Sequence, residues 1–126
     1  MNSPHTPNSS PVEILNIAHH LVVQLNPGAL EARKIQCITQ HITTAIQTGA
    51  AQSSGRYVVL AFTNIPLISS LGLAMCVDVY HCAKKNGMKC ATYGATNKIL
   101  DLFQLMHLDR MYENFSTESQ MQERLV

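Results

Sequence analysis

The sequence predicts a single α/β domain, built on a mixed, mostly parallel β-sheet with about four helices. Two observations indicate this class. Runs of β-branched and aliphatic residues alternate with longer segments whose apolar residues recur every three or four positions. Hydrophobic residues make up 46% of the 126-residue chain and charged residues only 13%, a balance typical of a folded domain with one core. Strands that alternate with helices are joined by right-handed crossovers, which makes them parallel.

The chain is expected to begin with a β-hairpin or meander. Two apolar runs, Ile14–Ile17 and Leu21–Leu25, flank Ala18-His19-His20 as strands flank a turn, and this antiparallel pair makes the sheet mixed. Asn26-Pro27-Gly28 ends the second strand. A helix is predicted next, over residues 29–48, because its apolar residues fall on one face. That face is formed by Ile35, Ile38, Ile42 and Ile46.

A central strand and a second helix follow. Residues Tyr57–Phe62 form a continuous apolar run, which is typical of a strand covered on both faces. The second helix is predicted to follow Ser70 and to run to about Asn86, where Asn86-Gly87 is a stop signal because Gly adopts the left-handed conformation easily. Its buried side is expected to comprise Leu73, Cys76, Val77, Tyr80 and Ala83. Met88–Tyr93 predicts the next strand.

The last third of the chain predicts two more helices with a short strand between them. Thr96 is a candidate cap for the first of these helices. The inward face of that helix would carry Ile99, Leu100, Phe103 and Met106. Residues Met111–Phe115 are expected to form a short edge strand. Ser116 or Thr117, together with Gln120, offers capping chemistry for a final helix. The apolar residues of that helix are Met121 and Leu125.

Composition excludes several classes of function. The net charge is +1, the nine Lys and Arg residues are scattered and aromatic residues amount to 6%, so no nucleic-acid partner is expected. No apolar run approaches the roughly 20 residues that span a bilayer, which argues against direct membrane insertion. Residues 1–11 have neither the basic nor the apolar region of a signal peptide. We expect a cytoplasmic protein with a disordered tail at 1–11 and its domain at 12–126.

Neither a metal site nor a catalytic site is expected. The four cysteines have no CxxC spacing, and three of them, Cys76, Cys82 and Cys90, fall at positions expected in the core, so they are interpreted as reduced thiols. His19 and His20 are adjacent and would point to opposite faces of a strand, which favours a turn or edge role. The sequence has no G-x-S-x-G elbow and no Gly-rich phosphate loop. We therefore expect a protein that is not an enzyme and has no cofactor.

One segment resembles a known family. The signature of STAS domains is an apolar strand, a loop and a D/S-S-x-G-L sequence that begins a helix. A similar pattern is formed here by Tyr57-Val58-Val59-Leu60, followed by Ile68-Ser69-Ser70-Leu71-Gly72-Leu73. The resemblance extends to residues 99–111, where His107 stands at a position that is usually Gly. It covers residues 12–125, nearly the whole chain. The resemblance implies a STAS-like fold and the function of an anti-sigma factor antagonist.

The same resemblance implies partners and site residues. Members of this family bind an anti-sigma factor with serine-kinase activity, are released when they are phosphorylated, and regulate transcription in this way; a phosphatase is a further possible partner. The phosphorylated residue corresponds to Ser70, and Ser69 occupies a position that is often Asp. Gly72 and Leu73 match the helix start of the family, and Asn26 lies in a loop that normally helps to form the kinase-facing surface. Partner binding is therefore assigned to Ser69, Ser70, Leu71, Gly72 and Asn26.

Physical chemistry supports a switch at Ser70 and leaves alternatives open. A phosphate at a first helical turn meets unpaired N–H groups, and it adds about −1.5 to −2 charges to a surface with few charges. The first alternative is that Ser69 and Ser70 only cap the helix. The second is a STAS scaffold without phosphorylation in a lipid-transport or signalling complex. The third is a small-ligand-binding or catalytic domain with a polar pocket at the carboxyl edge of the sheet. For Gly72, close backbone approach and tight helix packing both remain possible.

Overall fold

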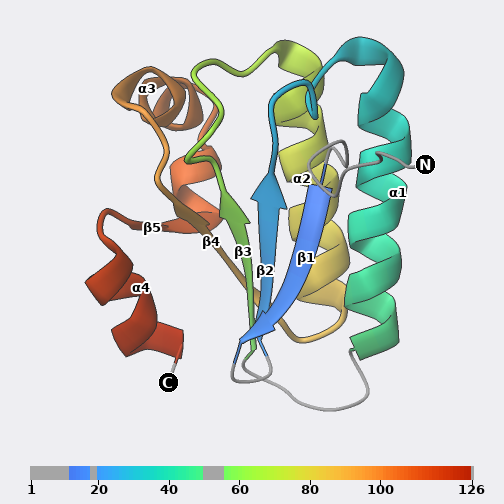
Figure 1. The fold of residues 1–126 in the computed structure, drawn as a ribbon, viewed down its shortest axis with the longest axis vertical. Helices are drawn as coiled ribbons and strands as arrows, with labels where there is room; N and C mark the ends of the chain where they lie inside the picture. Colours follow the sequence, from blue (N-terminus) through green and yellow to red (C-terminus); the bar gives the residue numbers. More distant parts are fainter. Residues whose placement is uncertain (1–11, 18–19, 50–55, 126) are drawn as a thin grey trace, which may run out of the picture.

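A five-stranded sheet runs through the molecule in the order β1-β2-β3-β4-β5 (Figure 1). The computed structural model describes residues 12–17, 20–49 and 56–125. β1 pairs with β2 in antiparallel fashion, and all other neighbours are parallel. The strands are β1 (Val12–Ile17), β2 (His20–Leu25), β3 (Tyr57–Ala61), β4 (Lys89–Tyr93) and β5 (Tyr112–Phe115). The predicted mixed, mostly parallel sheet is confirmed.

Four helices cover the two faces of this sheet. They are α1 (Ala32–Gly49), α2 (Ser70–Lys85), α3 (Asn97–Leu105) and α4 (Glu118–Leu125), with a short 3₁₀ turn at Leu108–Arg110. Helices α1 and α2 lie side by side on one face, and α4 lies on the other (Figure 1). The predicted order of strands and helices is confirmed. Among the described residues, no helix is both long and apolar enough to cross a membrane.

The core consists of two clusters, one on each side of β3. Val58 and Leu60 belong to the larger cluster beneath α1, α2 and α3. Tyr57 and Val59 point the other way and belong to the smaller cluster beneath α4. The helices contribute to the larger cluster through residues that include Ile38, Ile42, Val79, Ile99 and Phe103. Every residue of β3 is buried, as its continuous apolar run predicts.

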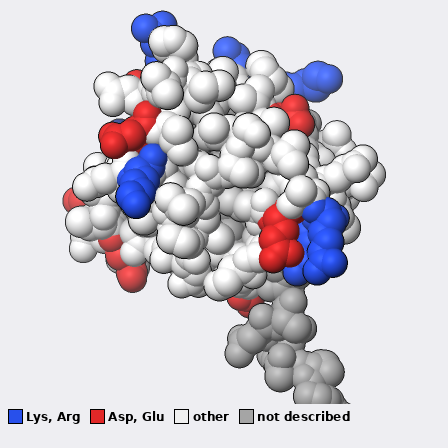
Figure 2. Space-filling view, turned by 90° about the horizontal axis from the view of Figure 1, so that it is seen from above, with Lys and Arg blue, Asp and Glu red and all other residues white. Residues whose placement is uncertain are grey.

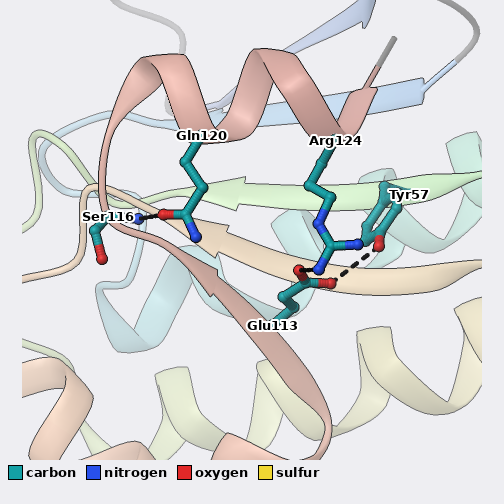
Figure 3. Close-up of polar contacts among 5 residues, drawn as sticks. All are labelled: Tyr57, Glu113, Ser116, Gln120 and Arg124. Carbon is teal, nitrogen blue, oxygen red and sulfur yellow. Dashed lines mark hydrogen bonds and ion pairs between the residues drawn. The ribbon is translucent and has the colours of Figure 1, made fainter.

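The start of α4 confirms the predicted capping residues. The Gln120 amide donates to the Thr117 hydroxyl at 3.0 Å. Figure 3 shows the second bond, in which the Ser116 amide donates to the Gln120 side-chain carbonyl at 2.9 Å. Each bond satisfies an N–H group that has no acceptor within the helix. The helix then buries Met121 and Leu125 against the sheet.

A polar network joins the other end of α4 to the sheet. Arg124 forms an ion pair with Glu113 at 2.5 Å, and the Tyr57 hydroxyl donates to the same carboxylate at 2.9 Å (Figure 3). Partial burial and the neighbouring carboxylate raise the pKa of Tyr57 above its ordinary value, which favours the protonated donor. The network connects α4 with β5 and β3.

Two predicted boundaries shift by a few residues. The first helix begins at Ala32, because residues 26–31 form turns in which the Ala29 amide donates to the Asn26 carbonyl and Gly28 has a φ of +87°. His20, predicted in the turn, is the first residue of β2, and its Nδ1 accepts a hydrogen bond from the Tyr57 amide at 2.9 Å. The predicted tail at 1–11 and the Ala18-His19 part of the turn lie outside the described residues.

Two predicted faces are partly wrong. On α2, Met75 and Val79 are buried, whereas Val77 and Tyr80 are only half-buried. On the next helix, Met106 is 55% exposed, because α3 ends at Leu105 and Met106 already belongs to its C-terminal cap. The four cysteines are free: Cys76 and Cys90 are buried, Cys82 is half-buried and Cys37 is exposed.

Candidate docking surface at the Ser70 end of the sheet

The strand-to-helix connection after β3 gives its two serines different roles. Ser69 is the N-cap of α2, and its hydroxyl accepts a hydrogen bond from the Gly72 amide at 3.2 Å. Ser70 is the first residue of the helix and is exposed. Its side chain makes no hydrogen bond with any residue that the structure describes. The capping function therefore belongs to Ser69, and the Ser70 hydroxyl is accessible.

Gly72 is required by packing. A Cβ atom at this position would lie 2.6 Å from Cγ1 of Ile68 and 3.5 Å from Cδ1 of Leu30. Both neighbours are side-chain atoms, so tight side-chain packing, rather than approach of another backbone, explains the glycine. Gly72 is buried, and it helps to place the start of α2 against the loop that carries Leu30.

The loop between β3 and α2 is held by both neighbouring strands. On the β2 side, the Gln24 side-chain amide donates to the Thr63 hydroxyl at 3.1 Å. On the β4 side, the Phe62 amide donates to the Tyr93 carbonyl at 2.8 Å. These bonds extend the sheet contacts beyond the end of β3 and fix the path of the chain towards Ser70.

A third attachment comes from the segment before α3. The Thr96 hydroxyl donates to the Pro66 carbonyl at 3.2 Å and accepts from the Ile99 amide at 3.3 Å, so one side chain caps α3 and also holds the loop. Gly94, with a φ of +73°, lets the two loops touch, since a Cβ there would lie 2.3 Å from Cγ2 of Thr63. The cap was predicted from the sequence, whereas the contact with Pro66 was not.

The surface around Ser70 carries two exposed leucines and few charged residues. Leu67 and Leu71 are 60% and 46% exposed. Asn26 is half-buried and follows β2, whose carboxyl end lies beside that of β3. Figure 2 shows this end of the molecule: its middle carries no charged side chain, and the charged residues lie towards the margin. We call Asn26, Leu67, Ser69, Ser70 and Leu71 the Ser70 surface.

His107 adopts a conformation that explains the usual glycine at its position. Its φ is 63° and its ψ is 19°, in the left-handed region that side chains with a Cβ rarely occupy. It is the N-cap of the 3₁₀ turn and makes no side-chain capping hydrogen bond. Within the part of the chain that the structure describes, no group of three or more His, Cys, Asp or Glu residues is arranged to hold a metal ion.

Comparisons with known proteins agree on the fold. The family model of the STAS domain matches residues 12–121. An anti-sigma-factor antagonist (STAS) domain protein from Planctomyces limnophilus superposes with a TM-score of 0.76 at 14% sequence identity, covering 91% of this chain and 97% of that one. A comparison with curated proteins found no significant match.

The anti-sigma factor antagonist SpoIIAA is similar in both of its forms. Its unphosphorylated form superposes with a TM-score of 0.71 at 18% identity, covering 90% of this chain and 95% of that one. The phosphorylated Bacillus protein gives a TM-score of 0.68 at 18% identity, with coverages of 91% and 99%. At these identities the superpositions show a common fold.

Proposed function

The chain belongs to the STAS-domain family, and from this premise we propose that it is an anti-sigma factor antagonist that binds an anti-sigma factor with serine-kinase activity and is released when Ser70 is phosphorylated. The observation that carries the proposal is the division of roles between two adjacent serines. Ser69 caps α2 through its hydroxyl, and Ser70 presents an exposed hydroxyl at the first helical position. A kinase reaches Ser70 without disturbing the cap.

The phosphorylated form is expected to keep its fold. The Gly72 amide already has the Ser69 hydroxyl as its acceptor, and the Leu73 amide donates to the Ser69 carbonyl at 2.9 Å. The amides of Ser70 and Leu71, in the first turn, have no acceptor within the helix. A phosphate on Ser70 lies near these donors and at the positive end of the helix dipole, which stabilises the added charge.

Release follows from the chemistry of the docked state. A partner that covers Leu67 and Leu71 also covers Ser70, which lies between them in the sequence, and removes water from its hydroxyl. A phosphate there would be an unpaired, desolvated dianion, which costs several kcal/mol. A penalty of about 3 kcal/mol lowers affinity about 100-fold, enough to dissociate a micromolar complex, whose binding free energy is about −8 kcal/mol. Removal of the phosphate by a phosphatase restores binding, so the protein alternates between a bound and a released form. This exchange takes place in the cytoplasm and regulates transcription through a sigma factor.

A constitutive scaffold is the competing function. A docking surface with exposed leucines and few charges also suits a STAS subunit that stays bound within a lipid-transport or signalling complex, and Ser69 stands where the antagonist pattern often has Asp. Ser and Asp are equally good N-cap residues, so this difference leaves the helix start unchanged. The scaffold differs from the switch in one respect: its binding would not depend on phosphorylation.

The test uses the anti-sigma factor kinases encoded in the same genome, purified and titrated against the chain by calorimetry. We expect one of them to bind and, in the presence of ATP, to phosphorylate Ser70, as mapped by mass spectrometry. Its affinity for the Ser70→Asp variant should be about 100-fold lower than for the unmodified chain. Ser70→Ala should bind like the unmodified protein and accept no phosphate at this position.

A matched control is available on the opposite face. Ser119 is exposed and is the second residue of α4, so Ser119→Asp adds the same charge to the first turn of a helix away from the Ser70 surface. Its affinity should equal that of the unmodified chain, and circular dichroism should show both Asp variants folded. Binding of Ser70→Asp at unchanged affinity would refute the switch and favour the scaffold.

A further inference from the structure

A groove between α1 and α2 begins beside the Ser70 surface. The two helices pack side by side, and the groove between their exposed faces has a volume of about 390 Å³. Its first lining residue on α2 is Leu71, the direct neighbour of Ser70. The remaining lining residues are Ile35, Gln36, Thr39 and Gln40 on α1, and Ala74, Met75 and Asp78 on α2.

The α2 side of this groove forms a single stripe. Leu71, Ala74, Met75 and Asp78 are spaced at three, four and seven residues from the first, so they lie on one helix face. The stripe is about 10 Å long, or two helical turns. Its upper part is apolar, with Leu71 exposed and the small Ala74 leaving room above the buried Met75.

The charge of the groove comes from one residue. Asp78 is the only charged residue in its lining, and it lies at the end away from Ser70. Arg33 and Lys34, near the start of α1, both face Glu31, at 3.8 and 3.9 Å. Asp78 forms no ion pair with any residue that the structure describes. A ligand that covers Asp78 must therefore supply a positive charge, because an unpaired buried carboxylate is costly.

We infer that this groove receives an amphipathic helix of the anti-sigma factor, with apolar side chains on Leu71, Ala74 and Met75 and a Lys or Arg side chain against Asp78. The inference rests on the proposed function and adds a second contact to it, one that does not involve the Ser70 hydroxyl. An apolar stripe of two turns with one terminal charge matches the mode in which a helix binds in a groove. Within this mode, the cation determines the direction in which the helix lies.

The experiment uses the anti-sigma factor that binds the unmodified chain in the titrations above. Asp78→Lys reverses the charge, and Ala74→Gln fills the groove with an uncharged side chain that favours helix. Each should weaken binding at least tenfold. Asp78→Asn should weaken it less. It should also make the affinity less dependent on NaCl, because Asp78 is exposed in the unbound chain and its attraction to the cation of the partner is screened by salt.

Two controls separate this inference from the proposed function. Asp101→Lys makes the same charge reversal at an exposed position on α3 and should leave the affinity within about twofold. Melting curves identify any variant that is not folded. If folded Asp78→Lys and Ala74→Gln bind as tightly as the unmodified chain while Ser70→Asp does not, the groove is not the docking site and the switch stands. If no anti-sigma factor binds the unmodified chain, both proposals fail.

Discussion

Replacing Gly72 with Ala tests the packing at the start of α2. The added methyl group would lie 2.6 Å from Cγ1 of Ile68, closer than two carbon atoms approach without displacement. Ile68 is buried and cannot turn into solvent, so the helix start or the Ile68 side chain must shift. The strain therefore lies between two named groups, and its size can be measured with a second substitution that removes one of them.

Two opposing effects determine the magnitude. Forcing a methyl group into a packed site costs about 1–3 kcal/mol, whereas Ala favours the helix over Gly by up to about 1 kcal/mol. We expect Gly72→Ala to lower the free energy of unfolding by about 1 kcal/mol. Ile68→Ala alone should lower it by about 2–5 kcal/mol through loss of buried surface and formation of a cavity. In the Ile68→Ala protein the strain is absent, so Gly72→Ala should be neutral or stabilising.

Urea unfolding of the four proteins in this cycle gives the coupling free energy, expected at about 1–2 kcal/mol. Gly87→Ala is the matched control at the other end of α2, because no atom lies within 4 Å of the position that its methyl group would occupy, and its cost comes from a φ of +76°. That cost should be the same with Ile68 or Ala at position 68. Additive effects of Gly72→Ala and Ile68→Ala would refute the packing argument.

Three further predictions concern stability. His107→Gly should raise the free energy of unfolding by about 0.5–1 kcal/mol in urea titrations, because Gly relieves the left-handed φ; a loss of stability would contradict this. Thr96→Val removes the bonds to Ile99 and Pro66 and should cost about 1–2 kcal/mol, and an unchanged unfolding midpoint would show that neither matters. Burial raises the pKa of Cys90 to about 12, so the contribution of this thiol to the free energy of unfolding is complete below pH 9 and is lost as the pH rises towards the folded pKa. Cys90→Ala should therefore make the fall in stability between pH 9 and 11 shallower by up to about 1.4 kcal/mol per pH unit. An unchanged slope would contradict this.

Local patterns were sufficient to predict the fold. The continuous apolar run of β3 predicts a strand covered on both faces. In the structure, Val58 and Leu60 pack under α1 and α2 on one face, and Tyr57 and Val59 pack under α4 on the other. The order of elements follows from alternating periodicities, and the parallel sheet follows from that order.

Side-chain orientation in α2 was harder to predict, because apolar residues occupy much of the circumference of this helix. Its sequence gives no clear preference for Val77 over Met75, and contact with both α1 and the sheet decides between them. Met106 continues the apolar spacing of α3, but the helix ends one residue earlier. Periodicity alone does not show where a helix ends.

The candidate site was predicted only in part for a similar reason. Ser69 and Ser70 belong to one short motif, and so their placement at the helix start follows from the sequence. The bond between Gln24 and Thr63 joins residues 39 positions apart, and no local pattern indicates it. Gly94 lies directly after β4, and a glycine at the end of a strand is only a weak signal that the chain passes close to another loop, here at Thr63.

The three attachments of the loop before Ser70 have an energetic consequence for association. A loop held by Gln24, Tyr93 and Thr96 has already lost most of its conformational freedom in the unbound protein. Ordering such a segment on binding often costs about 0.5–1.5 kcal/mol for each side chain that becomes immobile. Little of that entropy remains to be lost here, so the cost of ordering in any complex at this end of the sheet falls mainly on the other protein.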